Sequence, residues 1–140
     1  MIVCDTGPLV AAALKNDADH ERCVDLFDRL HAEGRELFVP ATVAAEAGYL
    51  IASEAGARVE SMFLQSLASG DFQPVDLAVA DYARMAELVL KYHDLPLGTT
   101  DASVVAVAER LKITDVATLD RRDFAVVRPQ HVTALRLLPE

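Results

Sequence analysis

Short apolar stretches alternate with longer segments of helical period along almost the whole chain. Each apolar stretch has the length of a strand, and each longer segment repeats its apolar residues every three or four positions. This alternation predicts an α/β fold with a mainly parallel central sheet. The expected strands are 2–4, 36–40, 72–75, 115–119 and 132–138, and the expected helices are 6–14, 18–33, 42–54, 57–69, 77–93 and 100–111.

The apolar positions of the helices also predict which faces are buried. In the helix over 77–93 the expected buried stripe is Tyr82, Met85, Ala86 and Val89. The acids Asp81 and Glu87 have basic residues three or four positions away, so they are expected on the solvent face. Thr99 or Thr100 is expected to cap the helix that follows.

The chain of 140 residues has the length of one domain, and 52% of its residues are hydrophobic, which suffices for a core without disulfides. We therefore expect a single domain over 1–140, with Cys4 and Cys23 as reduced thiols in the core. No leader peptide or membrane-spanning segment is expected, which points to a cytoplasmic protein. The net charge of −9 opposes simple electrostatic attraction of nucleic acid. Residues 102–139, however, carry six basic side chains against four acidic ones.

Four carboxylates lie where elements of the expected sheet end or helices begin. Asp5 follows the first strand directly, and Asp120 follows the fourth. Asp101 lies in the first turn of a helix and Glu46 in the second turn of another, each on the face that carries apolar residues. Because the carboxyl ends of parallel strands and the helices that leave them line one crevice, we expect the four side chains to converge.

Each acid also has to be weighed alone. Asp5 fits a helix cap, Asp101 complements the positive end of a helix, and Asp120 fits a turn. Glu46 on an apolar face has no such ordinary explanation. Four acids at one edge of a sheet favour a site for a hard cation such as Mg²⁺ or Mn²⁺, which carboxylate oxygens suit. Other chemistries lack their motifs, since HExxH, GxSxG, GxGxxG and GxxxxGK[ST] are all absent and the histidines are scattered.

Four sequence motifs surround these acids: IVCDTGPLVA (2–11), VPATVAAEAGYLI (39–51), LGTTDASVVAVAER (97–110) and VATLDRRDF (116–124). In this order and spacing the chain resembles the PIN-domain ribonucleases, and among them the VapC toxins of bacterial type II toxin–antitoxin pairs. The resemblance covers nearly the whole chain. It implies a three-layer α/β/α fold with a small, mainly parallel sheet.

The resemblance also implies an acidic site that binds one or two Mg²⁺ or Mn²⁺ ions. The residues that match this site are Asp5, Glu46, Asp101 and Asp120, with Asp123 able to share the role of Asp120. Thr6 and Thr100 lie where such proteins often carry a hydroxyl that supports the acids. The implied activity is metal-dependent cleavage of RNA phosphodiester bonds by an activated water, which inhibits translation and growth. The family further implies a homodimer and a cognate VapB-type antitoxin that blocks the site.

Three arginines leave a choice between two roles. Arg121, Arg122 and Arg128 either steer the RNA backbone toward the acids or only supply surface charge. Whole-protein alternatives also stay open. A receiver-like signalling domain would have an acidic Mg²⁺ pocket, but it needs an acid pair after the first strand and an Asp ending a middle strand. A catalytically silent binding module is a second alternative, and another metal-dependent phosphohydrolase, whose DxD spacing is absent at Asp5, is a third.

Overall fold

The computed structural model describes all residues 1–140, and its centre is one five-stranded sheet. The strands are β1 (Ile2–Cys4), β2 (Leu37–Pro40), β3 (Gln73–Val75), β4 (Asp115–Ala117) and β5 (Arg136–Leu138). They lie in the order β3-β2-β1-β4-β5, and every neighbouring pair is parallel. The predicted parallel sheet is confirmed. This order also differs from the 2-1-3-4-5 order of receiver-like domains, which argues against that alternative.

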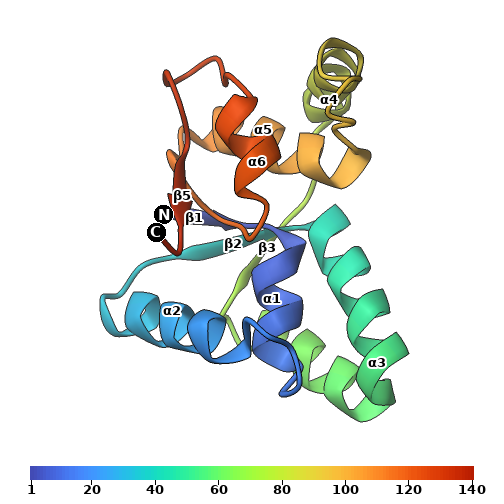
Figure 1. Ribbon diagram of the computed structural model, residues 1–140, viewed down its shortest axis with the longest axis vertical. Coiled ribbons are helices and arrows are strands. Elements are labelled where there is room, and N and C mark those ends of the chain that lie inside the picture. Colours follow the sequence, from blue (N-terminus) through green and yellow to red (C-terminus); the bar gives the residue numbers. More distant parts are fainter.

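Six helices cover the two faces of the sheet. They are α1 (Thr6–Ala13), α2 (His20–Ala32), α3 (Ala41–Ala68), α4 (Val79–Lys91), α5 (Thr99–Leu111) and α6 (Arg121–Val126). Figure 1 shows α1, α2 and α3 below the sheet and α4, α5 and α6 above it. The chain adds β2 and β3 on one side of β1 and then returns to add β4 on the other. Because parallel crossovers are right-handed, this reversal sends the later helices to the opposite face. The three-layer α/β/α architecture is therefore confirmed.

The core lies where the central strand meets the helices above and below it. All three residues of β1 are fully buried, and in α5 each residue from Ala102 to Glu109 is buried. Cys4 and Cys23 are free, buried thiols, as expected. No helix is both long and apolar enough to cross a membrane.

The two helices expected around Gly56 are the two halves of α3. Gly56 has φ +83° and ψ −178°, a conformation open almost only to glycine, and it kinks the helix. A β-carbon added at Gly48 in the first half would lie 3.8 Å from Glu60 Oε2 in the second, so the halves fold back toward each other. Helix α6 was not expected, because six residues carry too little periodicity to recognise.

The prediction for the buried face of α4 is right for Met85, which is 4% exposed, and wrong for the rest of the stripe. Tyr82 is 58% exposed and Val89 38% exposed, whereas Asp81 is only 3% exposed. Helix α4 turns Asp81 and Arg84 toward α5, where Arg110 donates from Nε to Asp81 Oδ2 over 3.0 Å, whereas Glu87 lies on the solvent face as expected. Asp81 also accepts from the backbone N–H of Ala78, which caps the helix. A buried charge is tolerable when it is paired in this way, and spacing within one helix does not reveal a partner on another.

Candidate metal centre

Asp5 lies at the middle of the sheet edge because β1 is the central strand. Its side chain is 6% exposed, and its backbone N–H donates to the carbonyl of Ala117 at the end of β4 over 2.8 Å. It occupies the N-cap position of α1, yet it makes no capping hydrogen bond to that helix. Instead, Oδ2 accepts from the hydroxyl of Thr118 over 2.8 Å. The cap interpretation of Asp5 is therefore wrong. Its carboxylate is held instead by Thr118, the residue that follows β4.

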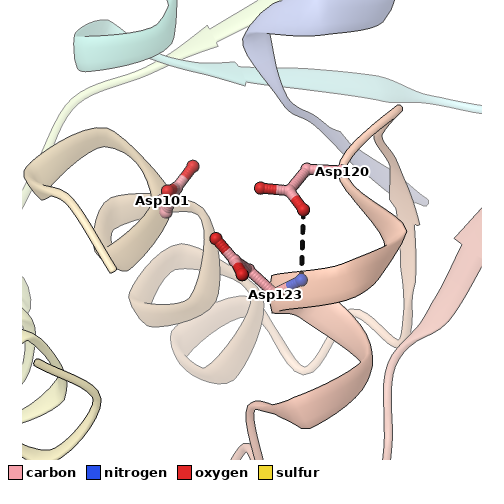
Figure 2. Close-up of side chains that lie close together, drawn as sticks. All are labelled: Asp101, Asp120 and Asp123. Atoms are coloured by element: carbon pink, nitrogen blue, oxygen red, sulfur yellow. Dashed lines mark hydrogen bonds between the residues drawn. The ribbon is translucent and has the colours of Figure 1, made fainter. Parts of the chain in front are cut away.

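Figure 2 shows three other carboxylates that gather near one another. One carboxylate oxygen from each of Asp101, Asp120 and Asp123 lies within 4.8 Å of the others. Asp101 comes from the first turn of α5, at whose N-cap lies Gly98 rather than Thr99 or Thr100. Asp120 precedes α6, and its Oδ1 accepts from the backbone N–H of Asp123 over 3.1 Å. The α6 turn thus brings both candidates for the fourth acid to the same cluster.

The carboxylates raise one another's proton affinity. Burial is the largest cause that raises the pKa of Asp101 from 3.8 to about 6, and the charges of Asp5, Asp120 and Asp123 add to it. Burial also raises the pKa of Asp5, despite hydrogen bonds from Thr118 and the backbone of Thr6 that lower it. The pKa of Asp123 is raised by burial and by Asp120. Clustered anions of this kind repel one another, and a cation between them removes most of the repulsion.

Glu46 does not lie where its expected face would place it. The buried stripe of α3 is formed by Val43, Ala47 and Ile51, whereas Glu46 is exposed. The prediction of an inward-facing Glu46 is therefore wrong, because the buried stripe includes the next residue, Ala47, instead. Its charge still contributes to raising the pKa of Asp5, but Glu46 is not part of the cluster that Asp101, Asp120 and Asp123 form.

Three threonines lie next to these acids in the chain or contact them. Thr6 is 7% exposed, and its Oγ1 is buried without a hydrogen-bond partner in the protein. Thr118 orients Asp5 and also accepts from the backbone N–H of Asp120 over 3.0 Å. Thr100 is half-buried, and its backbone carbonyl accepts from the hydroxyl of Ser103 over 2.6 Å. Sequence reasoning missed Thr118 and Ser103, since a single hydroxyl residue carries no recognisable pattern.

The three arginines differ in their surroundings. Arg121 donates from Nη1 to the carbonyl of Pro139 over 2.8 Å, and Arg128 donates from Nη1 to the carbonyl of Ala125 over 2.6 Å. These contacts hold the chain around α6 and β5. Arg122 is exposed, and its charge lowers the pKa of Asp123. Of the three, Arg122 therefore has the clearest electrostatic connection to the acids.

The position of the site in the sheet is the one at which open α/β proteins bind ligands. The strand order reverses between β1 and β4, and Asp5 and Asp120 follow these two strands. Residues 2–128 match the PIN domain family. The chain belongs to the PIN-domain family. Within it, 128 residues are 32% identical to Ribonuclease VapC26 of Mycobacterium tuberculosis (strain ATCC 25618 / H37Rv), covering 91% of this chain and 93% of that protein.

Solved structures support the PIN fold. Mycobacterium tuberculosis VapC20, described as a toxin that cleaves the sarcin–ricin loop, superposes with a TM-score of 0.77 at 18% identity, covering 87% of this chain and 92% of that one. VapBC2 from Rickettsia felis, bound to a DNA fragment from its promoter, superposes with a TM-score of 0.66 at 17% identity. The match covers 98% of this chain and 97% of that one. FitAcB from Neisseria gonorrhoeae superposes with a TM-score of 0.59 at 24% identity, and the match covers 86% of this chain and 88% of that one.

The residues present fit a divalent cation. Three carboxylate oxygens within 4.8 Å of one another form a donor set of the hard type that Mg²⁺ and Mn²⁺ prefer. The unpartnered hydroxyl of buried Thr6, next to Asp5 in the chain, fits a polar ligand beside that acid. Burial is the larger cause of the raised pKa values of Asp5 and Asp101, and the repulsion from neighbouring acids that adds to it is what a bound cation would remove.

Proposed function

We propose that this protein is a Mg²⁺- or Mn²⁺-dependent endoribonuclease and acts as the toxin of a type II toxin–antitoxin module. The observation that carries the proposal is the cluster of Asp101, Asp120 and Asp123 beside Asp5 at the reversal point of the sheet. Membership in the PIN family and 32% identity to a protein named as a ribonuclease support it. A nuclease needs a cation here, because the phosphate backbone would otherwise be repelled by the acids.

The carboxylates take different parts in this proposal. Asp101 and Asp120 would hold the cation with Asp123, and Asp5, fixed by Thr118, would bind it from the end of β1. A bound divalent ion would supply charge neutralisation at the scissile phosphate and activation of the attacking water. Glu46 would accept the proton of that water on its carboxylate. Thr6 would add a hydroxyl contact from the first turn of α1.

The proposed biological setting follows the relatives. Cleavage of RNA by the toxin would inhibit translation and growth in the cytoplasm, and a cognate VapB-type antitoxin would neutralise it. The protein would act as a homodimer. Arg122 would attract RNA phosphates near the cluster, while Arg121 and Arg128 mainly stabilise the chain around α6.

The decisive experiment compares Asp5→Asn with Asp28→Asn. Asp28 is an exposed acid of α2, so its variant keeps the site intact while removing the same charge. We expect wild-type protein and Asp28→Asn to cleave RNA with Mg²⁺ or Mn²⁺ and to arrest growth when induced. Asp5→Asn should do neither, because it loses a buried carboxylate of the site.

The same pair of variants separates catalysis from folding. Without metal, Asp5→Asn should melt at the wild-type temperature or above it, because it removes a charge from a repulsive cluster. Full toxicity of Asp5→Asn would contradict the proposed mechanism. Equal inactivity of the wild type and Asp5→Asn toward total RNA would favour the catalytically silent binding module. Mapping the cleaved ends in total RNA after brief induction would identify the target.

A further inference from the structure

Helix α6 decides where two of the three clustered acids lie. It carries Asp123 and begins directly after Asp120, whereas Asp101 comes from α5. Figure 2 shows the side chains of Asp101 and Asp123 between the two helices that carry them. A helix of six residues is too short to be stable by itself, so contacts with the rest of the protein hold it in place. These contacts therefore bear on the geometry of the acids.

Separate contacts hold the beginning, the middle and the end of α6. At its first residue, Arg121 donates from Nη1 to the carbonyl of Pro139, beyond the end of β5, over 2.8 Å. In the middle, Phe124 is 1% exposed and belongs to the core. The end is held from α4, because the hydroxyl of Tyr92 accepts from the backbone N–H of Arg128 over 2.9 Å. Arg128 lies two residues past the helix and 36 positions from Tyr92.

Tyr92 also organises the loop that leads to Asp101. It is the C-cap residue of α4, and its side chain is half-buried against the core. Its backbone carbonyl accepts from the N–H groups of Leu95 and Leu97 over 3.0 and 3.2 Å. Leu97 is 2% exposed, and the next residue, Gly98, is the N-cap of α5. One end of Tyr92 thus fixes the entry to α5, and the other end fixes the exit from α6.

We propose that Tyr92 is a positioning residue that restrains α6 relative to α5 and thereby keeps Asp120 and Asp123 close to Asp101. Carboxylate oxygens of these three acids lie within 4.8 Å of one another, so a small displacement of α6 changes the donor set offered to a cation. Tyr92 acts through the acids and not on the ligand. The inference deepens the proposed function and rests on it for the identity of the bound ion, whereas the contacts of Tyr92 are properties of the protein without metal.

The first test removes one hydroxyl oxygen from each of two tyrosines. Tyr92→Phe keeps the ring and loses the contact with Arg128, and Tyr49→Phe makes the same change at a 71% exposed position on α3. Calorimetric titration with Mn²⁺ should show about threefold weaker binding for Tyr92→Phe, a ratio typical of the loss of one solvent-accessible hydrogen bond. Tyr49→Phe should bind as wild type does.

The titrations are made at a temperature at which circular dichroism shows every variant to be fully folded. A purely structural role of Tyr92 would then leave the Mn²⁺ affinity unchanged, because no unfolded protein competes with binding. Wild-type affinity in Tyr92→Phe, or an equal loss in Tyr49→Phe, would overturn the proposal.

A second test needs no metal and separates this proposal from the proposed function. Amide hydrogen–deuterium exchange is followed in a chelator for wild type, Tyr92→Phe and Tyr49→Phe. Residues 123–128 should exchange faster in Tyr92→Phe, because the end of α6 opens more often, while α2 on the opposite face of the sheet stays unchanged. Unchanged exchange of 123–128 would overturn the proposal. A wild-type protein that binds no Mn²⁺ would contradict the proposed function, and the exchange data would still decide whether Tyr92 restrains α6.

Discussion

At the scale of single residues, burial and mutual repulsion disfavour the ionised form of Asp5 and Asp101. Asp101 is half-buried and has a pKa of about 6, against 3.8 for a free aspartate. The folded protein therefore binds protons more tightly than the unfolded chain between pH 4 and pH 6, approximately. Where the folded state holds more protons, stability falls as the pH rises. The raised pKa values of Asp5 and Asp123 act in the same direction.

This sign gives a prediction about pH. In a chelator, the protein should melt at a higher temperature at pH 5 than at pH 7.5. Asp101→Asn should reduce the difference, because an amide has no charge to lose. Added Mg²⁺ should raise the melting temperature at pH 7.5 more than at pH 5, since protonated acids bind cations poorly. Thermal unfolding followed by circular dichroism measures each value. Equal melting temperatures at both pH values, without metal, would show that the repulsion is negligible.

At the scale of elements, two buried ion pairs determine how α4 packs on α5. Arg84 donates from Nε and Nη2 to the two carboxylate oxygens of Glu109, over 2.8 and 3.0 Å. Glu109 also accepts from the backbone N–H of Gln130 over 2.9 Å, and it is 7% exposed. Arg84 has a second partner in Glu87, which is one turn away on the same helix and whose side chain is 66% exposed. Arg84 therefore pairs with one buried and one exposed carboxylate, and the strengths of the two ion pairs can be compared.

The comparison predicts unequal effects on stability. Glu109→Gln should lower the free energy of unfolding by about 2–3 kcal/mol, because it removes the charge that compensates partly buried Arg84. Glu87→Gln, the matched control, should change it by less than about 1 kcal/mol, since solvent screens an exposed pair. Urea titrations of the two variants measure both values. A similar loss in both would mean that the burial of Glu109 does not strengthen its pair.

The same two helices show what the sequence could and could not predict. Hydrophobic periodicity located all five strands and the long helices, because burying apolar residues fixes their period. It failed for the face of α4, where partners on another helix decide the packing. The candidate site divides in the same way. Asp5, Asp101 and Asp120 follow from the ends of elements, whereas the orientation of Glu46 and the contacts of Thr118 depend on tertiary structure.

At the scale of the whole molecule, the outer face of α4 is an uncharged surface on a protein with a net charge of −9. Its exposed apolar side chains include Val79, Tyr82 and Leu90, which are 88%, 58% and 76% exposed. Figure 1 shows α4 at the edge of the upper layer, away from the sheet. Along the helix, these residues and His93 are placed symmetrically about Ala86, at four and seven positions on either side. Antiparallel pairing of two α4 helices about Ala86 would join like surfaces by a two-fold axis.

This face provides a test of the proposed homodimer. Because two copies with a net negative charge repel each other, an uncharged surface is the favourable place for them to meet. In such a contact Leu90 faces Tyr82 of the other copy, so Leu90→Asp buries an unpaired charge against an apolar partner and should convert the dimer to a monomer. Leu64→Asp, at a 49% exposed position on α3, is the matched control and should leave the dimer intact. Analytical ultracentrifugation at micromolar concentration measures both, with circular dichroism to confirm that each variant is folded. A dimer that survives Leu90→Asp, or dissociates equally with Leu64→Asp, would place the interface elsewhere.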